Sequence, residues 1–576
     1  MDFIILYTAI PSGTEKMEES ILGSGFNCVK NLSRIKVFFK GNDFIKVNEN
    51  GYVFYTHLFR KNSFRRVNRK NIIFRNSVFR NFINKFYGKY VLYDVDEYNK
   101  FTIYRDITGS ISVFYKKIDQ GFIITSSIKL IYNMCDIELK INKEYALTYV
   151  FNGRFISNAS PFYGIYELPP GCSLCINKNL EINVDALWFS HLSKKYSSTK
   201  KSQITEYNII NILKKVINSY IAGNDIVQID YSGGLDSTCI LLATKSILHE
   251  KQDIIAIHAQ PKQITSESNE NMFVEEVMKD LNIKFQEVVF DEKKILFSHI
   301  DEIPNFPNYI DSIHVMPQNS KSNNAFTLNG EGGDQIFCTF PLFEMLIDII
   351  KDKEYKLLDI RLSSFKKIFN LTNAKVIHFL NKHLKNFPSS IIGEKVRDEK
   401  CRHKKYFINL ETIEDVNSFK LRELFVDSPG KFYHIELFLN ALSETLGVFK
   451  ESNRLFPMLE EPFLELILLI PTYNFYIDKF DRFPLRNAFS REFYPYKALW
   501  RKDKGYYFDM NFLLLKNNKT YVTSLIQNGQ LMRLGLINKS FFDLFDETIR
   551  LKDVHGLSLI SNVYLLERFF KKWDIQ

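Results

Sequence analysis

The chain has 576 residues and a mass of 67.8 kDa, and a single hydrophobic core stops growing at ~250–300 residues, so two or three domains are expected. With 45% hydrophobic and 25% charged residues, and only 24 Gly and 16 Pro, the composition excludes a collagen-like or largely disordered protein. The formal net charge of +10 is a mild excess over this length, which favours a phosphate-bearing or acidic partner but does not indicate nucleic acid.

Seven cysteines, an odd number scattered along the chain, indicate reduced thiols and a cytoplasmic protein. The N-terminal sequence has Asp2 where a secretory signal would carry positive charge. No apolar stretch reaches the ~18 residues that a transmembrane helix needs. We therefore expect no targeting segment and no transmembrane segment.

The first 190 residues contain short β-branched and aromatic runs separated by Asn, Gly and Ser. This pattern predicts a mostly β domain at 1–190. The expected strands are 3–7, 35–39, 90–93, 101–104, 111–115 and 122–125. Residues 191–203 (HLSKKYSSTKKSQ) are polar and lack a hydrophobic period, so they are predicted to form a linker.

From residue 204 onward, helical and strand patterns alternate, which predicts an α/β domain with a doubly wound parallel sheet. The expected helices are 206–221, 238–248 and 271–281, and the expected strands are 226–231, 253–259, 284–290 and 325–329. Beyond about residue 340 the patterns are mainly helical, for example at 343–350, 434–446 and 463–470. We assign 204–576 to this second domain, with a helical C-terminal part.

Eight basic residues between Arg60 and Arg80 are accompanied by no acidic residue. They are Arg60, Lys61, Arg65, Arg66, Arg69, Lys70, Arg75 and Arg80. Such a run can form an electrostatic partner surface. Because no nucleic-acid-binding signature accompanies it, a solvated face of the β domain is the favoured interpretation.

The strongest chemical motif is YSGGLDS (231–237), which lies between a buried strand and a helix. Gly233 and Gly234 allow a tight turn, while Ser232, Ser237 and the N–H groups at the helix start can donate to a pyrophosphate. Asp236 cannot bind phosphate directly, so its expected role is to hold Mg²⁺ against the phosphates of ATP. The motif differs from both the GxxxxGK[ST] loop and the GxGxxG loop.

A second motif, NGEGGDQIF (329–337), follows the last predicted strand of the same sheet. Ligands of parallel sheets bind at the carboxyl ends of the strands, so Asp334 is expected to reach the same Mg²⁺ as Asp236. Gly330, Gly332 and Gly333 would let the backbone approach the nucleotide.

The first motif resembles the pyrophosphate loop of ATP pyrophosphatases, which cut ATP between the α and β phosphates to adenylate a substrate. The two motifs, in this order, resemble the synthetase domain of the asparagine synthetase superfamily. The first domain is similar to the family's glutaminase-type domain, which has an αββα fold. The similar segments are FYGKY (86–90), YRDITG (104–109), TSS (125–127) and GIYELPPG (164–171). The family's glutaminase uses a cysteine directly after the initiator methionine, and here that residue is Asp2, so we predict that the glutaminase is inactive.

Within this superfamily, the chain is most similar to the lasso-peptide cyclases, which like the β-lactam synthetases join an inactive glutaminase-like domain to an active synthetase domain. The segments FDRFPLRNAF (480–489) and LWRKDKGYY (499–507) carry this similarity, while EEPFLEL (460–466) only partly matches the asparagine synthetase pattern. The resemblance implies adenylation of an Asp or Glu side chain of a precursor peptide, followed by attack of the peptide's N-terminal amine. It also implies a leader peptidase and a leader-binding protein as partners.

The resemblance suggests further site residues. A lysine before a glycine places positive charge over the acyl-adenylate, and Lys504 fits best, with Lys502 as a close rival. Glu331 matches a position that orients the attacking amine; β-lactam synthetases carry tyrosine there, so the glutamate favours asparagine synthetase chemistry. His258 and Glu270 are candidates to line the nucleotide site, and a capped or core histidine is an equally good interpretation of His258.

Two alternative functions stay open. The first is amidation of a small carboxylate with free ammonia, as in an asparagine synthetase. The second is a non-catalytic nucleotide- or peptide-binding scaffold, which Asp236 and Asp334 argue against because a scaffold needs no pair of metal-binding carboxylates.

Overall fold

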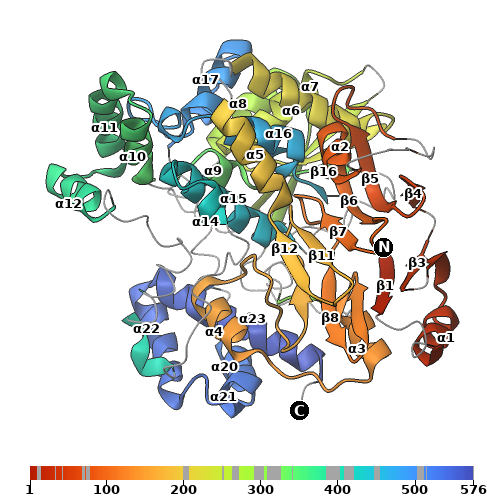
Figure 1. Cartoon of the computed structure of the whole chain (residues 1–576). Coiled ribbons are helices and arrows are strands. Elements are labelled where there is room, and N and C mark those ends of the chain that lie inside the picture. Colours follow the sequence, from red (N-terminus) through yellow and green to blue (C-terminus); the bar gives the residue numbers. More distant parts are fainter. Residues whose placement is uncertain are drawn as a thin grey trace.

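The computed structural model of the chain is shown in Figure 1. It describes residues 1–8, 15–32, 34–41, 43–67, 72, 78–198, 206–249, 252–261, 271–290, 304–307, 326–339, 342–383, 398, 402–407, 421–446, 454–502, 512–513 and 515–574.

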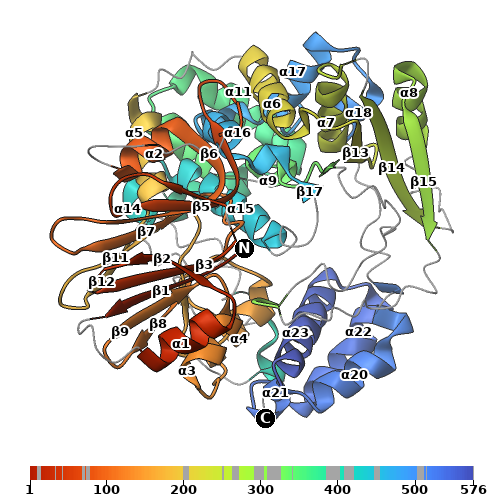
Figure 2. The ribbon, with the colours of Figure 1, turned by 90° about the vertical axis from the view of Figure 1, so that its right-hand side faces the viewer.

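The N-terminal domain contains two six-stranded antiparallel sheets, ordered β10-β8-β9-β1-β3-β2 and β12-β11-β7-β6-β5-β4, which Figure 2 shows stacked on one another. The strands of this domain are β1 (Asp2–Thr8), β2 (Asn27–Asn31), β3 (Ile35–Lys40), β4 (Phe44–Lys46), β5 (Tyr52–Arg60), β6 (Phe86–Val95), β7 (Phe101–Arg105), β8 (Phe114–Ile118), β9 (Gly121–Thr125), β10 (Tyr166–Glu167), β11 (Ser173–Ile176) and β12 (Ile182–Asp185). The helices are α1 (Glu15–Gly23), α2 (Val78–Lys85), α3 (Ile128–Cys135), α4 (Lys143–Asn152) and α5 (Leu187–Ser198). The predicted mostly β domain is confirmed.

Strand β1 lies in the interior of this domain, and both of its faces are buried. Successive side chains of a strand point to opposite sides, so each face of β1 meets a different set of residues. Phe3 packs on Phe54 of the second sheet, with ring centroids 5.5 Å apart. Ile4 belongs to a different buried cluster that includes Ile21 of α1 and Ile128 of α3. Helices therefore cover the outer face of the first sheet.

The second domain is built on a five-stranded parallel sheet ordered β15-β14-β13-β16-β17. Its strands are β13 (Ile226–Asp230), β14 (Asp253–Pro261), β15 (Lys284–Phe290), β16 (Phe326–Leu328) and β17 (Arg454–Leu455), and its helices α6 (Glu206–Ile221), α7 (Leu235–Lys245) and α8 (Asn271–Leu281) alternate with strands along the chain. The predicted α/β fold with a parallel sheet is confirmed. Strand β17 could not be predicted from the sequence, because two residues are too few to show a period.

The remainder of the chain is mainly helical, as predicted. The elements are α9 (Gly333–Ile336), α10 (Glu344–Lys351), α11 (Tyr355–Phe369), α12 (Asn373–His383), η3 (Lys404–Tyr406), α14 (Leu421–Leu424), α15 (Pro429–Thr445), η5 (Pro457–Leu459), α16 (Glu461–Leu468), η6 (Thr472–Asn474), α17 (Phe483–Glu492), α18 (Lys497–Trp500), α20 (Lys519–Gln527), α21 (Gln530–Arg533), η7 (Lys539–Phe542), α22 (Asp543–Leu551) and α23 (Val554–Lys572). Among the described helices, none is long and apolar enough to cross a membrane.

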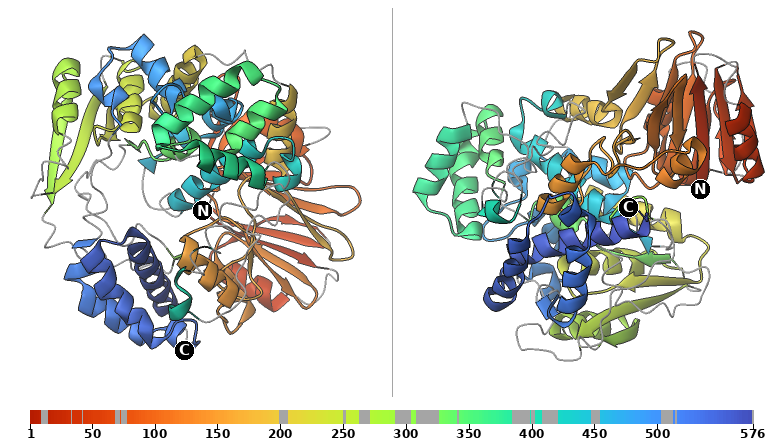
Figure 3. Two further views of the ribbon diagram at one scale, coloured as in Figure 1. Left: turned by 90° about the vertical axis from the view of Figure 1, so that its left-hand side faces the viewer. Right: turned by 90° about the horizontal axis from the view of Figure 1, so that it is seen from below.

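The last helices return to the N-terminal domain, where α23 lies beside α4 in Figures 2 and 3. Asn562 donates to the carbonyl of Val150 at 2.9 Å, and Phe162 stacks on Phe569 with centroids 5.8 Å apart. The C-terminal end of the chain therefore packs against the first domain, a contact that the sequence did not indicate.

Among the local predictions that differ from the structure are the linker and one strand. Residues 191–198 of the expected linker belong to helix α5, because Trp188 and Leu192 are buried and hold the helix against the protein; residues 199–203 lie outside the described residues. Strand β8 begins at Phe114, later than the predicted 111.

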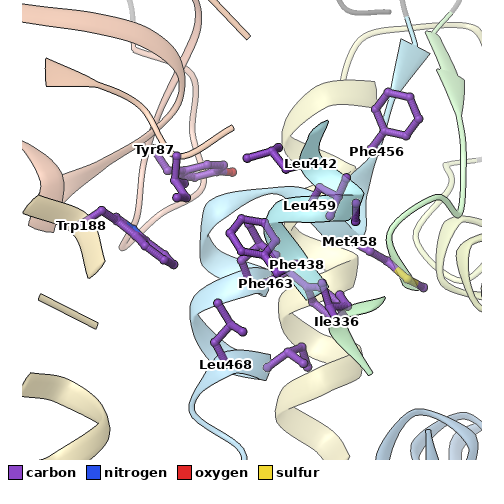
Figure 4. Close-up of a cluster of buried hydrophobic side chains, with 14 of the residues drawn as sticks. Tyr87, Trp188, Ile336, Phe438, Leu442, Phe456, Met458, Leu459, Phe463 and Leu468 are labelled. Carbon is purple, nitrogen blue, oxygen red and sulfur yellow. The ribbon is translucent and has the colours of Figure 1, made fainter. Parts of the chain in front are cut away.

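The two domains share a buried interface, shown in Figure 4, in which Tyr87 and Trp188 of the first domain face η5 and α16 of the second. Glu461 lies at the centre of the polar contacts here. Its Oε1 accepts a hydrogen bond from Trp188 Nε1 at 2.8 Å and pairs with Lys61 Nζ at 2.7 Å. The side chain of Glu461 is 1% exposed, so its charge is compensated inside the protein.

Lys61 belongs to the basic stretch 60–80, so the expected solvated face is wrong for this residue. Lys61 also lies 3.5 Å from Glu465, and Lys195 pairs with Glu465 at 2.5 Å. Lys61 is therefore held in the domain interface by two glutamates of α16, while Lys195, with 45% of its side chain exposed, pairs with one of them. Arg69, Lys70 and Arg75 lie outside the described residues.

Candidate active site

The loop after β13 turns sharply and then starts α7. Gly233 has φ +72°, a left-handed conformation that favours glycine. Ser232 Oγ lies 3.2 Å from Ser237 Oγ and also accepts from the N–H of Gly234 at 3.3 Å. The two serines therefore stabilise the turn that carries Asp236 on the first turn of α7.

The second predicted loop, 329–334, packs directly against the first. A Cβ atom on Gly333 would lie 2.4 Å from Cγ of Asp236, and one on Gly330 would lie 2.9 Å from the backbone nitrogen of Ser237. Gly332 has φ +91°, and a Cβ there would lie 2.4 Å from Leu459 of η5. These glycines therefore allow two loops and η5 to approach one another, in addition to the nucleotide approach that we predicted for them.

The carboxylates of Asp236 and Asp334 meet at one cation. Nη1 of Arg482 lies 3.0 Å from Oδ2 of Asp236 and 2.5 Å from Oδ1 of Asp334. The side chains of Asp236 and Asp334 are 17% and 25% exposed, whereas that of Arg482 is 7% exposed. Burial lowers the pKa of Arg482, but Asp236, Asp334 and Asp481 raise it by more, so the net shift is upward.

Arg482 is the site residue that the sequence analysis missed. It belongs to the segment FDRFPLRNAF (480–489), which resembles the lasso-peptide cyclases. Because Arg482 is far from both motifs along the chain, the sequence does not show that it contacts Asp236 and Asp334. The sequence signal that could have identified Arg482 is its charge within a segment that resembles the family.

The two carboxylates fit a magnesium ion. A cationic group already lies between them, so their oxygens are oriented toward a shared position. Within the described residues, no group of three or more His, Cys, Asp or Glu side chains is arranged to hold a metal. Mg²⁺ is commonly bound by only one or two carboxylates together with substrate phosphates, so Asp236 and Asp334 are sufficient protein ligands.

A third carboxylate, Asp230, lies at the end of β13. Its Oδ2 accepts from Asn329 Nδ2 at 3.0 Å and lies 3.7 Å from Arg454 Nη2. Burial raises the pKa of Asp230, although Arg454 and Asn329 oppose the rise. Asp230 thus joins the ends of β13, β16 and β17, and positions the loop that carries Asp334.

The other predicted site residues are more scattered. Glu331 is exposed, and its backbone N–H donates to Asn329 Oδ1 at 2.7 Å. His258 is buried, with Nδ1 2.9 Å from the carbonyl of Tyr231, which is the arrangement of a core histidine. Lys502 is exposed, with Nζ 5.2 Å from the ring centroid of Phe480.

Lys504 and Glu270 lie outside the described residues, so their predicted roles stay predictions.

In the first domain, the YRDITG segment is part of the core. Arg105 is fully buried and its Nη1 pairs with Glu167 at 2.6 Å. Asp106 is also buried and accepts from the N–H of Thr108 at 2.8 Å. Asp2, at the position of the family's nucleophile, accepts from Ser126 Oγ at 3.3 Å.

Comparison with known proteins matches both domains. Residues 76–188 match the glutamine amidotransferase domain, and residues 227–409 match asparagine synthase. The chain is 23% identical over 492 residues to the microcin J25-processing protein McjC of Escherichia coli, covering 83% of this chain and 85% of McjC. A solved structure, that of the allosteric regulatory enzyme of purine biosynthesis, aligns with a TM-score of 0.20 and 10% identity over 50% of this chain and 74% of that one, which carries no argument. The two matched domains, together and in this order, support the asparagine synthetase superfamily that the sequence motifs indicate.

Proposed function

We propose that the chain is an ATP-dependent ligase that activates a carboxylate as its acyl-adenylate, releases pyrophosphate and forms an amide bond with release of AMP. The observation that carries this proposal is the convergence of Asp236 and Asp334 from two interlocked loops onto one cationic contact. A carboxylate has a poor leaving group, and adenylation supplies a better one. The matched asparagine synthase domain supports the same reaction class.

In this proposal each part of the site has one role. Asp236 and Asp334 would hold Mg²⁺, which neutralises polyphosphate charge when bound. The N–H groups at the start of α7, with Ser232 and Ser237, bind the phosphate oxygens. The chain's own groups act mainly by positioning and by electrostatic stabilisation.

We further propose that the substrate is a ribosomal precursor peptide that is closed into a macrolactam ring, as in lasso-peptide biosynthesis. Support comes from the similarity to a microcin-processing protein over most of both chains. Asp2 supports it as well, because without a cysteine thiolate the first domain cannot release ammonia from glutamine, and the amine must come from elsewhere. The peptide's own N-terminal amine would gain the high effective molarity of an intramolecular reaction.

Two further residues would act on the peptide. Glu331, which is exposed in the loop that carries Asp334, would orient the attacking amine. Lys504, or Lys502 in its place, would stabilise charge on the acyl-adenylate. A leader peptidase and a leader-binding protein would prepare the peptide, and the reaction would take place in the cytoplasm, where ATP is available.

The test is to incubate the purified protein with ATP, Mg²⁺ and candidate precursor peptides, and to follow products by mass spectrometry. We expect one AMP per ring and a peptide that has lost one water. Added ammonium should compete poorly. Conversion of aspartate and ammonium to asparagine, with every peptide left unchanged, would instead favour the amidation of a small carboxylate, for which Glu331 is the supporting residue.

A further inference from the structure

Arg482 makes a forked contact that joins three carboxylates. Its Nη1 contacts both oxygens of Asp236, at 3.2 and 3.0 Å, and Oδ1 of Asp334 at 2.5 Å. Its Nε contacts Oδ2 of Asp481 at 3.2 Å. The residue is 6% exposed, so this cation is largely removed from water and depends on these anions.

The backbone of Arg482 is firmly held, while the contacts to Asp236 and Asp334 involve only the end of the side chain. Arg482 is the N-cap residue of α17 with φ +50°, and its carbonyl accepts from the N–H groups of Leu485 and Arg486. Arg486 in turn binds Asp481 at 2.9 Å. Asp481 is therefore held in place by Arg486. The guanidinium of Arg482 can rotate while its Nε stays bonded to Asp481.

The guanidinium and a metal ion compete for the same oxygens. Mg²⁺ binds oxygen at about 2.0–2.1 Å, and Nη1 of Arg482 already lies within hydrogen-bonding distance of the oxygens that would be ligands. Arg482 and Mg²⁺ cannot both occupy this position, because Arg482 already fills the space between the two carboxylates and compensates their negative charge. Asp236 and Asp334 thus bind either Arg482 or Mg²⁺.

We propose that Arg482 is a phosphate-binding residue that leaves Asp236 and Asp334 for the polyphosphate of ATP when Mg²⁺ enters. This inference rests on the proposed function in its use of the site for Mg²⁺ and ATP. A polyphosphate offers a guanidinium the same charge-assisted, forked hydrogen bonds as two carboxylates. The positive end of α17, directly after Arg482, favours an anion nearby.

The exchange makes metal binding depend on nucleotide. Mg²⁺ alone must displace Arg482 from two carboxylates and supplies no anion in their place, so it binds weakly. Mg²⁺ together with ATP supplies both the replacement cation and the new anionic partner. Arg482 thereby keeps the loops of Asp236 and Asp334 together and delays metal binding until nucleotide arrives.

The test uses the full-length protein and Mn²⁺, whose free signal in electron paramagnetic resonance reports binding directly. The wild type should bind Mn²⁺ weakly alone and at least ~10-fold more tightly with a non-hydrolysable ATP analogue, the size of one charge-assisted hydrogen bond. Arg482→Gln should bind Mn²⁺ at least ~10-fold more tightly than the wild type without nucleotide, and should bind the analogue more weakly. Arg491→Gln is the matched control on the same helix, since the Arg491 side chain is 70% exposed, and it should change neither value.

Equal Mn²⁺ affinity of the wild type and Arg482→Gln in the absence of nucleotide would overturn the exchange. If Arg482→Gln fails to fold, the wild type alone decides, because tight Mn²⁺ binding without nucleotide contradicts the proposal. No peptide is present in these measurements. A failure of peptide cyclisation with the Mn²⁺ results intact would therefore reject the proposed substrate and leave the exchange standing.

Discussion

Arg105 and Asp106 of the first domain lie in a packed core, whereas Asp236 and Asp334 of the second lie at the edge of a sheet with 17% and 25% of their side chains exposed. Both pairs belong to segments that resemble motifs of one superfamily. Arg105 is bound by Glu167 and by the carbonyls of Leu168 and Gly109. Asp236 and Asp334 instead share one partner, the guanidinium at the end of the Arg482 side chain.

A charged motif thus serves the fold or the chemistry according to its partners. A fully buried ion with backbone partners cannot exchange them without a large desolvation cost. Partly exposed carboxylates that are bound to the end of an arginine side chain can exchange this partner at a smaller desolvation cost.

The largest effect is expected from Asp334→Asn in the second domain. It should reduce ATP-dependent pyrophosphate release at least ~10³-fold, because a metal ligand contributes several kcal/mol to charge stabilisation. The folded state should remain, since the side chain is partly exposed. Asp359→Asn, an exposed position on α11, is the control and should keep full activity. Near-normal turnover of Asp334→Asn would remove this residue from the site.

Arg105→Leu should act on stability instead. It leaves Glu167 buried without its ion pair, which costs roughly 3–5 kcal/mol in urea unfolding. Lys140→Ala removes a lysine from an exposed pair with Glu138, 3.9 Å apart, and should cost almost nothing. If Arg105→Leu is as stable as the wild type, the first domain does not depend on this buried pair.

Lys61→Ala extends the contrast to the domain interface. Its removal leaves Glu461 buried beside Trp188, and we expect a loss of about 2–3 kcal/mol in the free energy of unfolding, less than for Arg105 because Lys61 is 16% exposed. Lys214→Ala, from the more exposed pair with Glu492, is the control and should cost under ~1 kcal/mol. Equal losses in the two variants would mean that burial at the interface adds nothing.

Asp106 should make stability depend on pH. Burial raises its pKa to about 7, despite opposing effects of Thr108 and Arg105. The folded state therefore binds more protons than the unfolded state between pH 4 and 7, so this group makes stability fall as pH rises through that window and adds no further change above it. Asp106→Asn should flatten the slope in urea unfolding from pH 5 to 8. Asp119→Asn, at an exposed turn, should leave the slope as it is.

The last prediction is that the protein has no glutaminase activity. Asp2 provides no thiolate, so the protein should release no glutamate from glutamine above background, with or without ATP. A coupled glutamate assay measures this directly. Glutaminase activity that survives in Asp2→Ala would show that another group acts as the nucleophile.

Much of the fold followed from local patterns. Helices α6 and α8 and strand β15 have the predicted bounds, because their periodic apolar residues meet the core in regular positions. The expected linker failed for the opposite reason. Its sequence is polar, and helix α5 is held there by buried Trp188, which precedes the segment, and by buried Leu192 within it, a packing effect that composition does not carry.

That Asp236 and Asp334 come together could be predicted from the sequence, because the carboxyl ends of parallel strands meet at one edge of a sheet. What lies between their carboxylates depends on the three-dimensional packing. Arg482 is 246 residues from Asp236 and 148 from Asp334 along the chain. The tight fit of Gly333 against Asp236 likewise depends on how two loops pack. Local patterns report which face of an element is buried, while contacts between distant loops depend on the summed packing of the elements that carry them.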